Sequence, residues 1–169
     1  MPMDAIVNVT PDWGIGRENA LLVSISADLR RFRALTAGKT LILGRKTLET
    51  FPQKKPLKGR KHLILSKSPN FTVENAQVFH DLPALLSHLR TLPREELCVV
   101  GGESVYRALL PYCDRALVTK TFLHAEADRF FPDLDALPEW CVTASSAPQE
   151  ENGMVFQFID YVNRNPQPL

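Results

Sequence analysis

Six short apolar runs, separated by helical patterns, most constrain what this chain can fold into. The runs are rich in branched side chains and cover residues 5–9, 40–44, 62–66, 76–80, 96–102 and 115–122. Continuous runs of this length are typical of strands buried on both faces, as in parallel sheets covered by helices. The helical patterns cover residues 27–37, ended by Gly38; a short segment after Lys46; a segment opened by Asp81 with Pro83 in its first turn; and residues 103–110, stopped by Pro111. This alternation predicts an α/β domain with a mainly parallel sheet.

The C-terminal part of the chain departs from this alternation. Residues 139–148 and 153–162 flank the turn-like segment QEENG, which predicts a β-hairpin that adds an antiparallel pair at a sheet edge. The total is an eight-stranded, mostly parallel sheet with four flanking helices. A length of 169 residues, 44% of them hydrophobic, suits one sizeable core, so we expect a single domain over residues 1–169.

Composition disfavours several classes of protein. No window approaches the ~18 continuous apolar residues of a membrane span, and no basic stretch precedes an apolar run at the N-terminus, so we expect a cytoplasmic protein that does not insert into membranes. The cysteines at 98, 113 and 141 are odd in number and far apart, which disfavours a disulfide framework. Histidine and cysteine spacings do not predict a metal site. No long exposed apolar helix face indicates a partner subunit, so a monomer is expected.

The positive charge of the chain is concentrated in one stretch. The net charge is +1, but residues 45–67 contain eight basic residues and one acid. A solvated basic loop is one interpretation. Nucleic acid is disfavoured because it calls for interleaved aromatic residues and a more basic chain overall. A small polyanionic ligand fits the pattern better.

Residues suited to binding anions follow three of the predicted strands. The first strand end carries Gly44, Arg45, Lys46 and Thr47, the second carries Ser66 and Lys67, and the third carries Gly101, Gly102, Glu103, Ser104 and Val105. Ligands of open α/β sheets bind beyond the carboxyl ends of the strands, and glycines there let the backbone approach a phosphate closely. A Gly-Gly turn that only connects a strand to a helix is the alternative. The three ends together predict a site for a phosphorylated nucleotide, although neither the GxGxxG nor the P-loop pattern is present.

Asp28 lies in the first turn of the helix predicted from Ser26. A negative side chain is favoured there by the exposed N–H groups and the helix dipole. The position also falls on the apolar stripe that includes Leu29 and Phe32, so the carboxylate is a candidate for chemistry as well. An ion pair with Arg31 is a further alternative. The preceding loop, residues 11–22, is either a mobile lid over a site or a plain surface loop.

Six separated motifs, taken in order, resemble a known family. GIGRENALL, SADLRRFR, ILGRKTLE, PLKGRKHLILS, VVGGESVYRALL and ALVTKT resemble dihydrofolate reductases of the bacterial chromosomal type across nearly the whole chain. The resemblance implies an eight-stranded mixed sheet with four helices and hydride transfer from NADPH to dihydrofolate. It also implies that Asp28, with Thr119, contacts the pterin and promotes N5 protonation through water. Antifolate inhibitors such as trimethoprim are implied as further ligands.

The resemblance also assigns residues to the two ligands. The residues implied around the substrate are Ile6, Val7, Leu29, Phe32, Phe51, Leu57 and Val100, with Arg60 on the glutamate α-carboxylate. The residues implied around the cofactor are Asn8, Ile15, Gly44, Arg45, Lys46, Thr47, Leu65, Ser66, Lys67, Gly101, Gly102, Glu103, Ser104, Val105 and Tyr106. The Gly101-Gly102 peptide bond is expected to be cis.

Three departures from the family pattern bear on the site. The chain has Leu21, Leu22 and Val23 where the family commonly has Leu-Pro-Trp or Leu-Pro-Phe, and Asn8 where a small apolar residue is usual. Lys54 and Lys55 resemble an insertion beside the substrate tail. We hypothesise that these changes alter antifolate sensitivity. A reductase of riboflavin synthesis, which shares the fold and NADPH, and a non-catalytic module that binds NADPH remain as alternative functions.

Overall fold

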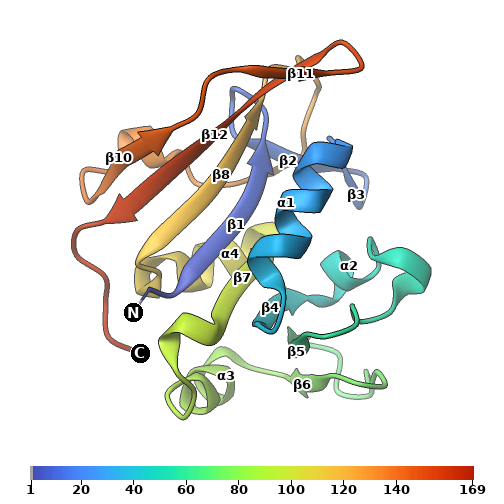
Figure 1. Ribbon diagram of the computed structural model, residues 1–169. Coiled ribbons are helices and arrows are strands. Elements are labelled where there is room, and N and C mark those ends of the chain that lie inside the picture. Colours follow the sequence, from blue (N-terminus) through green and yellow to red (C-terminus); the bar gives the residue numbers. More distant parts are fainter. Residues whose placement is uncertain (1) are drawn as a thin grey trace.

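The architecture is a mixed β-sheet with helices on both faces (Figure 1). The structure is a computed structural model that describes residues 2–169. The main sheet contains β1 (Asp4–Val9), β4 (Thr40–Gly44), β5 (Lys61–Leu65), β6 (Gln77–Phe79), β7 (Leu97–Gly101), β8 (Arg115–Thr121), β10 (Trp140–Ser145), β11 (Gln149–Glu151) and β12 (Met154–Asn163). Their order is β10-β12-β8-β1-β7-β4-β5-β6, with β11 paired to β12.

Strand direction confirms the predicted mixed sheet. Every pair from β8 through β1, β7, β4 and β5 to β6 is parallel, and β12 is antiparallel to β8, β10 and β11. The central strands β4 and β7 are buried almost throughout, as the continuous branched runs predicted.

The C-terminal hairpin differs in detail from the prediction. The segment QEENG is not all turn, because Gln149–Glu151 forms β11 and pairs directly with β12. The turn is confined to Asn152 and Gly153, whose φ angles are +52° and +80°. Two successive residues with positive φ make the tight turn that joins antiparallel strands without splaying them, which lets β11 and β12 pair up to the turn.

Residues 11–22 were predicted to be a loop, but half of the segment is paired in strands. β2 (Gly14–Arg17) and β3 (Ala20–Leu21) form a hairpin that turns at Glu18 and Asn19, and β2 also pairs with β9 (Arg129–Phe130). The sequence could not predict this small second sheet because β9 lies more than 100 residues further along the chain.

The four predicted helices are all present. They are α1 (Ser26–Thr36), α2 (Arg45–Leu48), α3 (Leu82–Leu89) and α4 (Glu103–Leu109). The Asp81 carboxylate caps α3 by accepting a hydrogen bond from the Ala84 N–H at 2.8 Å. Short 3₁₀ turns complete the chain at Pro52–Lys54, Arg94–Glu96, Leu110–Tyr112 and Leu134–Ala136. Within residues 2–169, no helix has both the length and the apolar character needed to cross a membrane.

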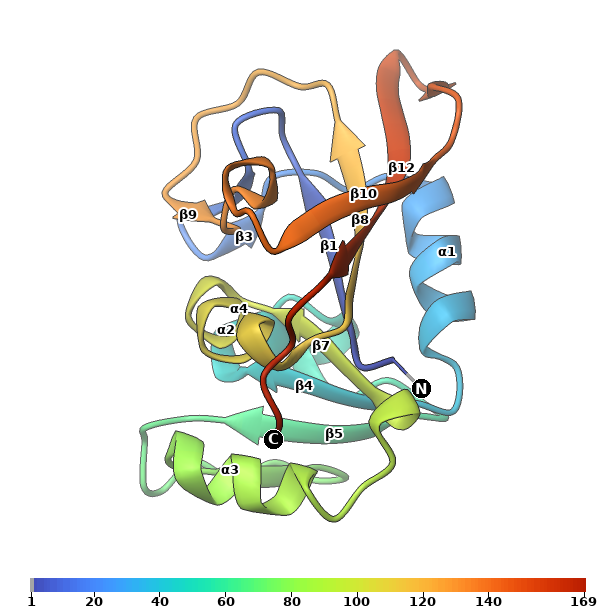
Figure 2. The same cartoon turned by 90° about the vertical axis from the view of Figure 1, so that its left-hand side faces the viewer.

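The two faces of the sheet carry separate apolar clusters. α1 lies on one side of β1 and β8, and α4 lies on the other (Figure 2). The larger cluster packs α3 and α4 against the sheet through residues such as Leu85, Val105 and Leu109. The second cluster joins β4, β5 and β7 to α2 and to Phe32 of α1.

Candidate active site

Asp28 stands at the N-terminal end of α1 and reaches across to the sheet. Its Oδ1 accepts a hydrogen bond from the Thr119 hydroxyl of β8 at 2.6 Å, although 91 positions separate the two residues. Thr119 is 2% exposed, and the Asp28 carboxylate is half-buried. The alternative ion pair with Arg31 does not form, because that guanidinium lies 3.4 Å from Asp160. Asp28 is therefore both a first-turn residue of the helix and part of a built polar site.

The second oxygen of the same carboxylate also has a partner. Oδ2 of Asp28 accepts a hydrogen bond from Nδ2 of Asn8 at 3.0 Å. The Thr121 hydroxyl donates to Oδ1 of Asn8 at 2.8 Å. Sequence reasoning expected Asn8 beside the cofactor and missed Thr121. The two-residue period of a strand was the available signal, since it puts residues 119 and 121 on one face of β8.

The apolar stripe of α1 is only partly covered by the protein. Thr36 is the one buried residue of the helix, whereas Phe32 is half-buried and Leu29 is 46% exposed. A surface helix on a sheet ordinarily buries such a stripe against the core. An apolar strip that remains open beside a half-buried carboxylate has the character of a ligand site.

Most of the predicted substrate residues come together beneath this stripe. Those that pack in one cluster are Ile6, Phe32, Phe51, Leu57 and Val100. Val7 is not among them, because successive side chains of β1 face opposite sides of the sheet and Val7 belongs to the larger cluster on the far face. The backbone N–H of Leu57 donates to Nε2 of the buried His62 at 3.0 Å, and this hydrogen bond fixes the position of Leu57 in the cluster.

Arg60 lies at the other end of α1 from Asp28. Its guanidinium donates to the Thr36 hydroxyl at 3.2 Å, to the Arg33 carbonyl at 2.9 Å and to the Lys58 carbonyl at 2.6 Å. The helix rises 1.5 Å per residue, so eight residues separate the two ends of the stripe by about 12 Å. The arrangement suits an elongated ligand with N–H donors at one end and a carboxylate at the other.

Two glycine-containing strand ends meet close to this site. The Gly101-Gly102 peptide bond is cis, as expected. A Cβ atom added to Gly102 would lie 3.2 Å from the Thr47 hydroxyl, and one added to Gly44 would lie 3.4 Å from a Val105 methyl. A side chain at Gly102 would crowd the Thr47 hydroxyl, and one at Gly44 would fill the space beside Val105. Backbone N–H groups and the Thr47 hydroxyl are thereby left open to a phosphate group.

The other predicted cofactor residues are dispersed around these strand ends. Lys46, Lys67 and Ser104 are exposed, Leu65 and Ile15 are half-buried, and Ser66 is buried. Arg45 lies 3.4 Å from Glu49 and over the Phe71 ring at 4.6 Å. Glu103 accepts a hydrogen bond from the Phe130 N–H at 2.7 Å. Tyr106 is buried and donates to the Ile6 carbonyl, and burial raises the pKa of this phenol well above its usual value.

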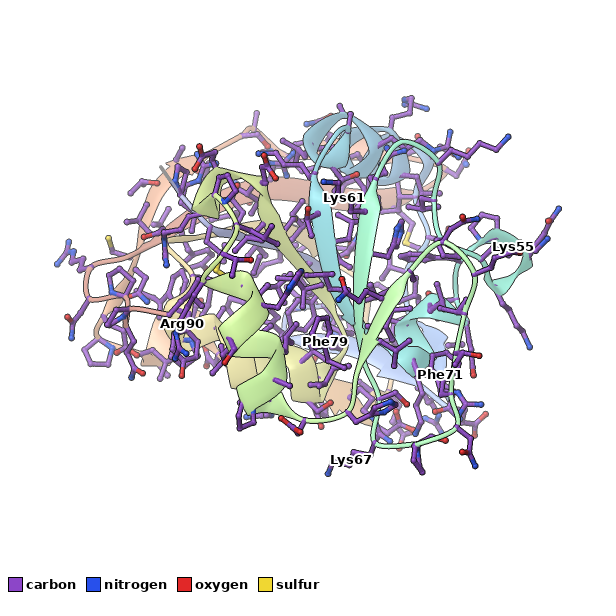
Figure 3. All side chains as sticks on the ribbon, turned by 90° about the horizontal axis from the view of Figure 1, so that it is seen from below. Lys55, Lys61, Lys67, Phe71, Phe79 and Arg90 are labelled. Carbon is purple, nitrogen blue, oxygen red and sulfur yellow. The ribbon has the colours of Figure 1, made fainter. Side chains whose placement is uncertain are left out.

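The basic stretch, residues 45–67, does not form a single patch. Lys55, Lys61 and Lys67 lie at well-separated places on the surface (Figure 3). Lys54, Lys55 and Lys58 lie between Phe51 and Arg60 in the sequence, whereas Arg45 and Lys46 begin α2 directly after Gly44. The positive charge of this stretch is thus spread over several parts of the surface.

Comparisons with known proteins agree with this description. A family model described as dihydrofolate reductase matches residues 2–163. The dihydrofolate reductase of Mycobacterium leprae (strain TN) is 37% identical over 140 residues, covering 78% of this chain and 84% of the relative. That of Bacillus subtilis (strain 168) is 33% identical over 153 residues, covering 89% and 88%. The solved structure of dihydrofolate reductase from Enterococcus faecalis complexed with NADP(H) and RAB-propyl matches with a TM-score of 0.83 and 28% identity, covering 95% of each chain.

The sheet order and the Asp28–Thr119 site define an α/β protein with a carboxylate at the start of a helix, and the matched relatives make it a reductase. The matched family model and the two bacterial relatives make the assignment specific: the chain belongs to the dihydrofolate reductase family. The family model spans nearly all of residues 2–169, so the resemblance seen in the six motifs is confirmed.

Proposed function

We propose that this protein reduces 7,8-dihydrofolate to 5,6,7,8-tetrahydrofolate with NADPH. The observation that carries the proposal is the half-buried Asp28 carboxylate, hydrogen-bonded to Thr119 at 2.6 Å, at one end of a partly open apolar strip that has Arg60 at its other end. Dihydrofolate matches this layout, since it has ring N–H donors at one end, a flat apolar middle and a carboxylate at the other end.

Each residue of the strip has a role that follows from its chemistry. Asp28 accepts hydrogen bonds from the pterin amino group and the ring N–H, and its negative charge favours the protonated pterin. Thr119 orients the carboxylate. The proton reaches N5 through water, since Asp28 binds the opposite side of the ring. Ile6, Leu29, Phe32, Phe51, Leu57 and Val100 exclude water from the rings, while Arg60 binds the tail carboxylate.

The residues at the strand ends fit a dinucleotide phosphate. NADPH, when bound, supplies the hydride to C6 of the substrate. Gly44, Gly101 and Gly102 leave space that a Cβ atom would fill, and the Thr47 hydroxyl lies beside them. The residues that would bind phosphate and adenosine are Arg45, Lys46, Thr47, Ser66, Lys67, Ser104 and Val105. The Enterococcus faecalis relative is complexed with NADP(H), which supports this choice of cofactor.

Asp28→Asn tests the proposal. Loss of NADPH absorbance is followed with and without dihydrofolate over about pH 5 to 9. The amide keeps the shape of the side chain but removes the charge, so turnover should fall by roughly 10²-fold or more. Activity should recover in part at low pH, where the substrate is already protonated in solution.

Asp81→Asn is a matched control, because it makes the same chemical change at the cap of α3 and Asn caps a helix as well as Asp does. Dihydrofolate-independent turnover, or an Asp28→Asn variant as active as the parent, would contradict the proposal. NADPH binding without any oxidation on addition of dihydrofolate would favour a non-catalytic module.

A further inference from the structure

The side chain of Asn8 is bound to Asp28 and not left free for a cofactor. Nδ2 of Asn8 donates to Oδ2 of Asp28 at 3.0 Å, and the Thr119 hydroxyl donates to Oδ1 at 2.6 Å. Asn8 and Thr119 are opposite each other in the parallel β1–β8 register, so both hydrogen bonds come from one rung of the sheet. Each carboxylate oxygen therefore has one donor supplied by the protein.

Thr121 holds the oxygen end of the Asn8 amide. Its hydroxyl is fully buried and donates to Oδ1 of Asn8 at 2.8 Å. An ionised carboxylate only accepts hydrogen bonds, so the amide nitrogen must face Asp28 and the amide oxygen must face Thr121. The Thr121 hydroxyl suits this arrangement because it can donate a hydrogen bond to the amide oxygen of Asn8.

We propose that Asn8, held by Thr121, is a positioning residue that hydrogen-bonds the Asp28 carboxylate and fixes its plane for the substrate ring. A carboxylate has about four acceptor positions, two on each oxygen. Thr119 and Asn8 occupy one position on each oxygen, which leaves one on each for the paired N–H donors of a pterin. The proposal rests on the proposed function for the identity of that ligand but not for the hydrogen-bond chain itself.

Charged groups on the neighbouring elements are engaged elsewhere. Arg31, on the same helix as Asp28, lies 3.4 Å from Asp160 of β12. The ammonium group of Lys120, in β8, lies over the ring of Trp13 on the opposite face of the sheet. Tyr106 of α4 is buried, and burial, followed by the nearby Cys98 thiol and Asp28, raises its pKa so that it stays neutral. The direct hydrogen bonds to the Asp28 carboxylate therefore come from neutral donors.

The test compares the parent with Asn8→Leu and Thr121→Val. Each new side chain is similar in shape to the one it replaces, but Leu lacks the amide and Val lacks the hydroxyl. Removing a donor from an ionised carboxylate favours its protonated form. In Asn8→Leu the midpoint of the Asp28 carboxyl titration, followed by ¹³C NMR and assigned with Asp28→Asn, should move up, and kcat/KM should fall by about tenfold. The corresponding limb of the pH–rate profile should move up with it.

The double variant shows whether Thr121 acts through Asn8. Thr121→Val should give a smaller upward shift in the parent and no further shift in the Asn8→Leu background, which is the coupling expected of residues in one chain of hydrogen bonds. Thr91→Val, which removes a hydroxyl at the end of α3, is the control and should leave both readouts unchanged. NADPH binding and the unfolding midpoint report whether each variant is folded.

An Asn8→Leu titration that superimposes on that of the parent would overturn the proposal, as would equal effects of Thr121→Val in both backgrounds. The NMR titration needs no turnover. If the parent failed to oxidise NADPH with dihydrofolate, the proposed function would fail while the titration still decided the role of Asn8.

Discussion

The buried hydroxyl of Tyr106, in α4, donates a hydrogen bond of 2.6 Å to the backbone carbonyl of Ile6, in β1. Ile6 stands two residues before Asn8 on the strand that carries the Asp28 network. The hydrogen bond therefore ties the helix that follows the Gly-Gly turn to the strand beneath the carboxylate. The Tyr106 phenol thus joins the glycine-containing strand ends to the apolar strip beside Asp28.

Tyr106→Phe should destabilise the protein. It leaves the phenyl packing against Phe131, whose ring centroid lies 4.7 Å away, but it deprives a carbonyl of its partner in the interior. Loss of one partner of a buried hydrogen bond costs about 1–3 kcal/mol of unfolding free energy. Urea unfolding measures this loss directly.

Tyr112→Phe is the matched control, because the Tyr112 side chain makes no hydrogen bond with another of residues 2–169 and its loss of a hydroxyl should be nearly neutral. Equal unfolding midpoints for Tyr106→Phe and the parent would show that the hydrogen bond contributes nothing net.

His62 should make stability depend on pH. It is 2% exposed, and burial lowers its pKa from the ordinary value of about 6.5. Nε2 accepts the Leu57 N–H, which only the neutral ring can do, and Nδ1 has no partner among the described residues. Below pH ~6.5 the unfolded chain binds a proton that the folded chain does not bind until its lower pKa is reached. Unfolding free energy should therefore fall as pH falls below ~6.5, by at most about 1.4 kcal/mol per pH unit from this group.

His62→Gln separates this effect from other titrations. The Gln side chain offers an oxygen in place of Nε2 and does not titrate, so the slope of unfolding free energy between about pH 5 and 6.5 should be smaller in the variant. His124→Gln, in the loop before β9, is the control and should retain the slope of the parent. Parallel curves for parent and His62→Gln would rule out His62 as the source.

Local sequence signals predicted the main sheet because each one has a direct physical cause. Branched residues in short runs gave the buried strands β4 and β7, and Asp81 gave the start of α3 through its cap. Signals of this kind failed where pairing depends on distant residues. The hairpin of β2 and β3 is held partly by β9, and nothing within residues 11–22 indicates that partner.

The same contrast between local signals and distant contacts applies to the candidate site. Asp28 was identified from its own helix, because a first-turn carboxylate on the apolar stripe is visible in one segment. The role of Asn8 could not be identified from its own strand. Its partner Thr121 lies 113 positions away, and the hydrogen bond depends on the parallel register of β1 and β8. Val7 was assigned to the substrate by resemblance, but strand alternation turns its side chain to the other face.

Arg60→Lys should impair substrate binding with little effect on the chemical step. The guanidinium is held by Thr36 and by the carbonyls of Arg33 and Lys58, and two of its five N–H groups remain for a ligand. Lysine keeps the charge but cannot form two parallel hydrogen bonds with a carboxylate. KM for dihydrofolate should rise by roughly tenfold with kcat almost unchanged, because a contact remote from the reacting atoms contributes equally to the ground state and the transition state.

A truncated substrate distinguishes loss of this contact from a disturbed helix end. A dihydropterin that lacks the benzoylglutamate tail should be reduced equally well by the parent and by Arg60→Lys, since it carries no carboxylate for either side chain. Arg90→Lys, at the C-terminal end of α3 (Figure 3), makes the same substitution outside the site and should leave KM for dihydrofolate unchanged. A KM increase that persisted with the truncated substrate would mean that Arg60 acts by supporting α1, because only damage to the shared apolar strip would impair both substrates.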